Sequence, residues 1–351
     1  MLVGGCDFSV AYIPDGAAWD VARKDNEPLK EKDDLQRLLF QLEDKMQQVS
    51  SKYATIAAMI DNALFITGKH VPGIIKYYPK PLVSDVVVQH VSLGLLHIVF
   101  TDSDGVLWGA GSNRCGQLGV ADVTEVSSPA PVDIGEKIER AVCGEYFTMA
   151  LDEVGHLWSF GKNINGELGI GVKSTGTHVP QFLPQLADII DLDCGEEHTT
   201  CVDIKGHVYS WGKGTNGRLG DTEQRLTPAV VEGIQDIVTT RCGNGFTLCL
   251  DSSGRVWAFG TNYCGQLGLG HNQNVLNPTR IESLRDVARI VCGGMHAFCI
   301  DMNGCIWGFG CNEKDQLGLG DTENRNKPSP LPEYFCLRLL KKKCMAKSAR
   351  K

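Results

Sequence analysis

Apolar residues along this chain alternate with polar or small residues in short runs, and the runs return in a fixed order. One set comprises Ile290–Cys292, Ala297–Ile300 and Cys305–Phe309, rich in β-branched and aromatic side chains and separated by glycine and other turn residues. Period-two runs of this length are typical of β-strands. The pattern therefore predicts short strands joined by tight turns.

Seven units of this pattern share one frame, in which an aromatic residue follows three positions after a turn Gly or Asn. The units lie 43 to 51 residues apart, a spacing typical of propeller blades. They are centred on Trp19, Phe65, Trp108, Trp158, Tyr209, Trp257 and Trp307. We therefore expect an all-β fold, a seven-bladed β-propeller over residues 1–340, with a basic C-terminal tail over residues 341–351.

The turn before each aromatic residue carries Gly in six units and Asn62 in the other. These residues adopt left-handed backbone angles most easily, so the turn is that of a β-hairpin and its Asp residues need no catalytic role. A motif Gly-x-Asn-x-x-Gly-x-Leu-Gly follows, as in Gly161–Gly169, and we expect its Leu to pack between blades. The segment Phe335–Leu340 falls where a further unit would begin, so we expect it to supply a closing strand to the first blade.

These residues resemble the regulator-of-chromosome-condensation repeat, with Cys194–Thr199, Val208–Gly212 and Trp257–Gly268 as near-complete matches. The resemblance covers almost the whole chain and is weaker in the first two units, where Ala54 replaces the frame His and the first unit lacks the Asn and Gln-Leu-Gly. It implies a seven-bladed propeller. Some relatives are exchange factors for the small GTPase Ran.

Composition narrows the functional class. The formal charge of −8 argues against sequence-independent DNA binding, and the absence of an apolar run of 18 residues points to a soluble protein of the cytoplasm, the nucleus or both. The chain has fourteen cysteines and no Cys-x-x-Cys motif. The pairs Cys194/Cys201, Cys242/Cys249 and Cys292/Cys299 recur in the blade frame, so we expect buried strand residues rather than disulfides or a metal site. Leu35, Leu38, Leu39 and Leu42 have helical spacing, and the segment from 30 to 42 is either a helical insertion or an outer strand.

No arrangement typical of an enzyme stands out. Residues 166–174 approach a phosphate-binding loop but insert Val172 before the Lys. The frame histidines His97, His198 and His296 occupy a position that Phe fills in other units, so we expect structural hydrogen bonds from them. We expect no cofactor, no metal and no catalytic chemistry.

The two residues before each frame His or Phe distinguish one such propeller from another. In Ran exchange factors of the resembling family, acidic and histidine side chains from these turns engage the GTPase. By position, the resemblance assigns partner contacts to Asp7, Tyr53, Glu145, Tyr146, Glu196, Glu197 and Asn244. The alternative is that the carboxylates are simply solvated turn residues.

Three functions follow from these features. The favoured one is a protein-interaction platform, with a Ran-like small GTPase as a candidate partner. The alternative is a guanine-nucleotide exchange factor for a Ran-like GTPase, although the nearly uniform units leave no long insertion to act as a wedge. The third is a UV-B photoreceptor, whose Trp and Arg residues in these turns are missing here.

Overall fold

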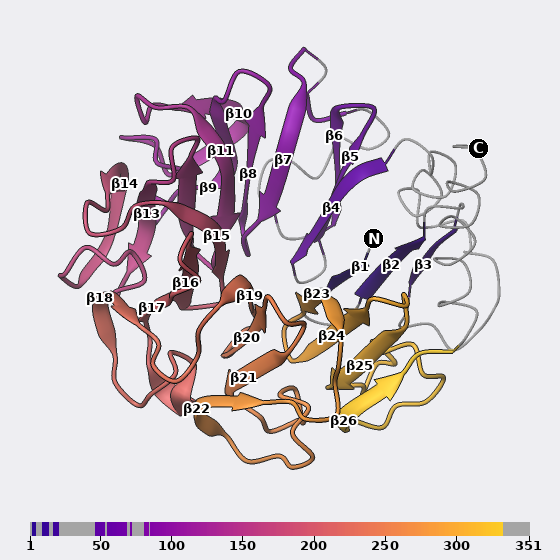
Figure 1. Ribbon diagram of the computed structural model, residues 1–351. Helices are drawn as coiled ribbons and strands as arrows, with labels where there is room; N and C mark the ends of the chain where they lie inside the picture. Colours follow the sequence, from indigo (N-terminus) through magenta and orange to yellow (C-terminus); the bar gives the residue numbers. More distant parts are fainter. Residues whose placement is uncertain are drawn as a thin grey trace, which may run out of the picture.

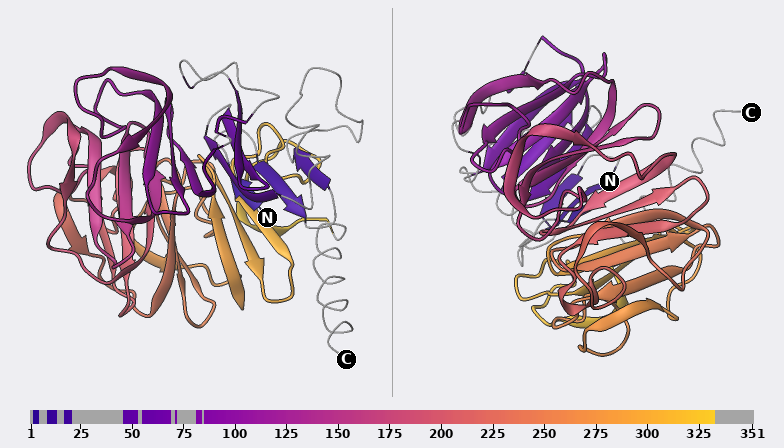
Figure 2. Two further views of the ribbon diagram at one scale, coloured as in Figure 1. Left: turned by 90° about the horizontal axis from the view of Figure 1, so that it is seen from above. Right: turned by 90° about the vertical axis from the view of Figure 1, so that its left-hand side faces the viewer.

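The computed structural model describes residues 2–4, 9–13, 17–20, 46–52, 55–68, 71, 81–83 and 85–332. They form antiparallel sheets arranged around a central channel, in sequence order (Figure 1). Figure 2 shows two further views, in which the chain can be followed from the purple sheet of β7–β10 to the yellow strand β26. The only helical element in the described part of the chain is a short 3₁₀ turn, η2 (Thr215–Gly217). The all-β prediction is therefore confirmed.

Five sheets have four strands each, and within a sheet each strand pairs with its neighbours in the sequence. The strands of the first three are β7 (Val88–Leu93), β8 (His97–Asp102), β9 (Leu107–Ser112), β10 (Glu125–Val132); β11 (Ile138–Cys143), β12 (Phe147–Asp152), β13 (Leu157–Asn163), β14 (Ser174–Phe182); and β15 (Ile189–Cys194), β16 (His198–Asp203), β17 (Val208–Gly212), β18 (Arg225–Val230). The last two contain β19 (Ile237–Cys242), β20 (Phe246–Asp251), β21 (Val256–Gly260), β22 (Val275–Arg280); and β23 (Val287–Cys292), β24 (His296–Asp301), β25 (Ile306–Gly310), β26 (Arg325–Pro330).

The number of blades differs from the prediction. A sixth blade has three strands, β4 (Met46–Lys52), β5 (Thr55–Ile60) and β6 (Ala63–Gly68). The remaining sheet, of β1 (Leu2–Gly4), β2 (Ser9–Ile13) and β3 (Ala17–Asp20), lies beside β4 and β23. Its strands are only three to five residues long, and no fourth strand joins it among the described residues. The predicted seven-bladed propeller is therefore wrong. The structure has six blades, and one small three-stranded sheet lies between the blade of β4–β6 and the blade of β23–β26.

The motif after the third strand holds the loop that leads to the fourth strand. The side chain of Asn113 donates to the carbonyl oxygens of Val120 (2.6 Å) and Val123 (2.9 Å) and accepts from the amide of Leu118 (2.9 Å). The same side chain thus holds both sides of the loop that leads into β10. The first two units lack this motif, and their sheets have three strands among the residues that the structure describes.

Several predictions fall outside the described residues. These are the closing strand Phe335–Leu340, the segment from 30 to 42 and the basic tail from 341 to 351, so the closing strand and the helical insertion stay predictions.

The hydrophobic core lies between adjacent blades rather than inside a single sheet. The motif residue Leu168 is fully buried and clusters with Trp211 of the next blade, and Leu267 clusters in the same way with Phe309. The expected packing of the motif Leu between blades is confirmed. Each blade therefore depends on its neighbour to bury its apolar face, as in other repeat folds.

Candidate functional site

The turns that join the first and second strands of successive blades meet on one face of the ring. In each turn, the residue that directly follows the Gly donates its amide hydrogen to the carbonyl oxygen of the equivalent residue in the next blade. This series runs from Leu95 to Glu145 (3.0 Å), Glu145 to Glu196 (3.2 Å), Glu196 to Asn244 (3.3 Å) and Asn244 to Gly294 (2.9 Å). We call the surface formed by these turns the turn face. Its backbone is continuous across five blades.

The structure brings together five of the residues predicted to contact a partner. Glu145, Tyr146, Glu196, Glu197 and Asn244 are half-buried and lie in consecutive turns of this face. The two others, Asp7 and Tyr53, fall outside the described residues.

Glu197 differs from its neighbour because two lysines from different blades enclose its carboxylate. Lys162 contacts one oxygen at 2.8 Å, Lys213 contacts the other, and Asn165 donates to the first at 3.2 Å. Burial alone would raise the pKa of Glu197, but the two lysine hydrogen bonds outweigh it and hold the pKa below its usual value. Glu197 is therefore a link between blades more than a free surface charge.

Lys162 connects this ion pair to the neighbouring turn. Its ammonium lies 5.8 Å from the centre of the Tyr146 ring and 3.8 Å from the buried carboxylate of Glu167. Burial raises the pKa of Glu167, and burial together with nearby Glu145 raises the pKa of the Tyr146 phenol. The phenol is therefore a neutral contact group at physiological pH.

Sequence reasoning missed the basic residues of this face. Lys162 and Lys213 each follow the first Gly of the loop motif, while Arg218 stands where other blades carry Gln or Glu before the motif Leu. Gln117 and Gln266 accept a backbone amide two residues earlier, at 2.9 Å in each case. Arg218 has no acceptor, so it donates to the Thr215 carbonyl (3.1 Å) and the Asn244 carbonyl (3.4 Å) instead. The Arg at position 218, in place of the Gln or Glu of other blades, was the feature of the sequence that could have revealed this difference.

The frame histidines tie adjacent blades together. His97 Nε2 lies 3.1 Å from the hydroxyl of Thr148, and His198 Nε2 lies 3.1 Å from that of Thr247. Both rings are fully buried. The predicted structural hydrogen bonds are therefore confirmed for His97 and His198.

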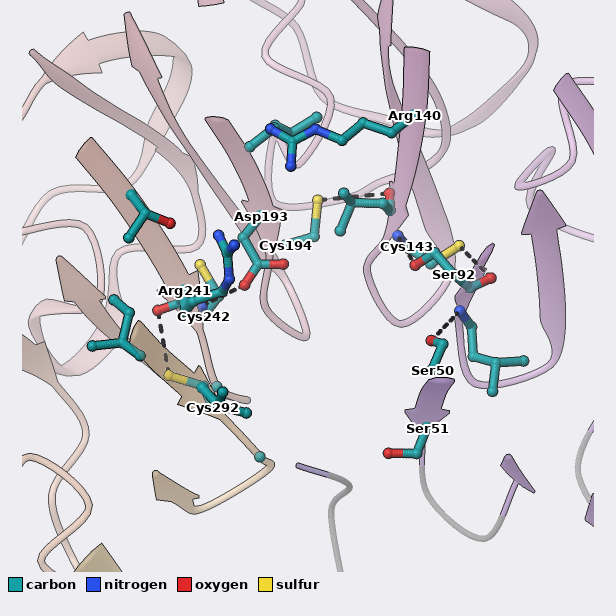
Figure 3. A pocket seen from close by; sticks show the side chains of 18 of the residues that line it. Ser50, Ser51, Ser92, Arg140, Cys143, Asp193, Cys194, Arg241, Cys242 and Cys292 are labelled. Atoms are coloured by element: carbon teal, nitrogen blue, oxygen red, sulfur yellow. Dashed lines mark hydrogen bonds between the residues drawn. The ribbon is translucent and has the colours of Figure 1, made fainter. Parts of the chain in front are cut away.

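A cavity of about 500 Å³ occupies the central channel and is lined by the innermost strands (Figure 3). Four of these strands end in Cys143, Cys194, Cys242 and Cys292, none of which is disulfide-bonded. Side chains facing the channel cap the exposed edge of the next strand: the Ser92 hydroxyl accepts the Cys143 amide at 3.0 Å, and Asp193 accepts the Cys242 amide at 2.7 Å. The polar side chains that line the channel thus accept hydrogen bonds from backbone amides at the inner edges of the sheets.

The channel also holds an ion-pair cluster. Asp191 accepts from Arg140 at 3.0 Å and from Arg241 at 2.8 Å, and these arginines lie in the blades on either side of it. Burial opposes ionisation of Asp191, but the two arginines prevail and lower its pKa. Burial, followed by the same two arginines, lowers the pKa of His90 to about 4. At neutral pH this cluster therefore contains an ionised Asp191 and a neutral His90, and its ion pairs link three blades.

A comparison with protein families decides the identity of the fold. The RCC1-like domain model matches residues 69–346. The chain belongs to the RCC1-like domain family. The match excludes the first unit and most of the second, the same units in which the repeat motif is weak and the sheets have three strands.

Related RCC1-like proteins match parts of the chain. Human protein RCC2 is 35% identical over 127 residues, which are 35% of this chain and 24% of RCC2. Human regulator of chromosome condensation is 28% identical over 228 residues, 54% of each protein. The chain thus matches about half or less of the length of these relatives.

The solved structure of Prp20p from Saccharomyces cerevisiae, described with its binding to Gsp1p and histones, shares the fold. It superposes with a TM-score of 0.73 at 17% identity, over 87% of this chain and 82% of Prp20p. In the part of the chain that the structure describes, no helix is long and apolar enough to cross a membrane.

Proposed function

We propose that this RCC1-like propeller is a protein-interaction platform whose turn face binds a small GTPase of the Ran class. The observation that carries the proposal is the continuous backbone series from Leu95 to Gly294, which places turn residues that differ from blade to blade on one surface. A rigid surface of this kind binds without a large ordering cost.

The charges of the turn face support a choice of contact residues. Glu197 is neutralised by Lys162 and Lys213, so Glu145, Glu196 and Tyr146 supply the contacts on this part of the face. Acidic residues beside a lysine-bound network suit a partner with basic side chains around its own contact site. Prp20p, which has the same fold, is described as binding Gsp1p, and this likeness supports a GTPase as the class of partner.

Nucleotide exchange is a second candidate function. It is favoured by the acidic turn residues Glu145 and Glu196, which stand at the positions that engage Ran in the exchange factors of the family. Exchange requires only that the face bind the nucleotide-free GTPase more tightly than the loaded one.

The test measures binding and exchange separately. Purified full-length protein is titrated against a panel of small GTPases in nucleotide-free, GDP-bound and GTP-analogue-bound states, and release of a fluorescent guanine nucleotide is followed in parallel. We expect binding to one GTPase, weakened at least tenfold by Glu196→Ala. Acceleration at catalytic amounts of the protein would establish the exchange factor.

Glu153→Ala is the matched control. This exposed glutamate follows β12 at the end opposite Glu145, so it changes the same charge on the other face. Equal losses for both variants would contradict a site on the turn face. Failure to bind any member of the panel would refute the GTPase as partner.

A further inference from the structure

The loop motifs of adjacent blades bring two positions face to face. These are the residue before the second Gly of one motif and the residue after the first Gly of the following motif. At one boundary, Asn216 Nδ2 donates to the hydroxyl of Thr261 at 3.2 Å. At the next boundary, the same two positions are held by Cys264 and Cys311.

The backbones at these two boundaries approach equally closely. A Cβ placed on Gly260 would lie 3.2 Å from the Cα of Arg218, and one placed on Gly310 would lie 3.1 Å from the Cα of Gln266. Cys264 and Cys311 thus occupy the two positions that are in contact at the preceding boundary, and the backbones carry them equally close together.

Both cysteines are held in place by their own backbone. The amide of Cys264 donates to the side chain of Gln266 at 2.9 Å, and the amide of Cys311 donates to the carbonyl oxygen of Met295 at 2.8 Å. Neither thiol is fully buried, unlike those of Cys194, Cys201, Cys242 and Cys249. The pair therefore combines proximity, fixed position and access for a small reagent.

We propose that Cys264 and Cys311 are an oxidisable pair that closes into a disulfide between two adjacent blades when a small disulfide such as glutathione disulfide is present. One protein thiol loses its proton and attacks a sulfur of the oxidant, which forms a mixed disulfide and releases one glutathione thiolate. The second protein thiol loses its proton and attacks the cysteine sulfur of the mixed disulfide, which releases the second glutathione thiolate. Two protein thiols are oxidised and one glutathione disulfide is reduced to two glutathione molecules.

The environment sets the rate of this reaction. Burial, the neighbouring Cys311 and Glu313 raise the pKa of Cys264 to about 11. Because the thiolate is the attacking species, the bond forms slowly at neutral pH and faster as the pH rises. The bond would fix two blades beside the Gly294–Met295 turn, independently of which partner the turn face binds.

Mass spectrometry of the intact chain tests the proposal. Reduced, folded protein is incubated with glutathione disulfide at pH 8, remaining thiols are blocked with N-ethylmaleimide, and the protein is digested with trypsin without reduction. Cys264 is then the only cysteine of the peptide from 256 to 280, and Cys311 lies in the peptide from 290 to 314. We expect these two peptides to be linked, with fragment ions that place the bond at Cys311.

Matched variants separate this pair from its neighbours. Cys305→Ser removes another half-buried cysteine of the same tryptic peptide and should leave the link unchanged. Cys264→Ser and Cys311→Ser should abolish it and leave glutathione on the remaining partner. A bond through Cys305, mixed disulfides on both residues without a link, or two unmodified thiols in the folded wild-type protein would overturn the proposal, even if the single variants of the pair did not fold.

Discussion

The Oδ2 atom of Asp102 accepts a hydrogen bond of 2.8 Å from the indole nitrogen of Trp108, six residues further along the chain. Its Oδ1 atom accepts the amides of Asp104 (2.9 Å) and Val106 (3.0 Å). Asp152, Asp251 and Asp301 repeat the arrangement with Trp158, Trp257 and Trp307. One carboxylate thus fixes both the hairpin turn and the aromatic residue of its blade, which explains why the turn needs Asp without any catalytic role.

Asp251→Asn should therefore destabilise the protein in a pH-dependent way. Burial alone would raise the pKa of Asp251, but hydrogen bonds from Arg255 and Trp257 lower it. The unfolded chain consequently binds this proton first as the pH falls. The stabilisation is complete above the unfolded pKa of about 3.9 and is lost as the pH drops through the folded pKa.

We expect the variant to lose about 1–2 kcal/mol in the free energy of unfolding at pH 7, and the difference from wild type to shrink towards pH 3. Urea unfolding at several pH values measures both. Asp104→Asn, at an exposed turn carboxylate, is the control and should stay within about 0.5 kcal/mol. A difference that grows on acidification would contradict the assignment.

Gly144→Ala should prevent normal packing of its blade. A Cβ at this position would lie 1.9 Å from the ring of Phe147, which covers the glycine. We expect a loss of at least about 3 kcal/mol or failure to fold. Gly233→Ala provides the comparison, since φ is +84° there but nothing lies within 4 Å, so only backbone strain of about 1–2 kcal/mol applies. Equal thermal shifts for the two variants would refute the steric explanation.

His198→Phe should cost less than His198→Ala. The Phe ring suits this position, as Phe147 and Phe246 show in other blades, and it removes the hydrogen bond to Thr247 while keeping the packing. We expect a loss of about 1 kcal/mol for Phe and about 3 kcal/mol for Ala, which also leaves a cavity. Chemical denaturation distinguishes them, and a larger loss for Phe would show that the hydrogen bond outweighs the packing.

Glu196→Ala and Glu197→Ala should separate binding from stability. Glu197→Ala leaves Lys162 and Lys213 without their shared carboxylate, so we expect a loss of about 1–3 kcal/mol in the free energy of unfolding. Glu196→Ala should stay within about 0.5 kcal/mol and affect partner binding instead. Differential scanning calorimetry of both variants is the measurement. A destabilised Glu196→Ala variant would place Glu196 in the structural network as well.

The repeat frame, the strands, the hairpin turns and the position of the turn residues could all be predicted from the sequence, because each depends on residues close together in the chain. Gly144 beneath Phe147 and Asp251 beside Trp257 are local relationships of this kind. The family resemblance and the packing of Leu168 between blades also followed from the repeat.

The number of blades and the charge state of the turn face, in contrast, became clear from the folded structure. The short strands β1–β3 fit the repeat frame, yet whether a sheet gains a fourth strand depends on contacts that the frame does not encode. Glu196 and Glu197 are the same type of residue at adjacent positions, but Glu197 forms ion pairs with two lysines that lie 35 and 16 residues away in the chain. A carboxylate is neutralised by whatever charges folding brings beside it, and those charges come from different blades.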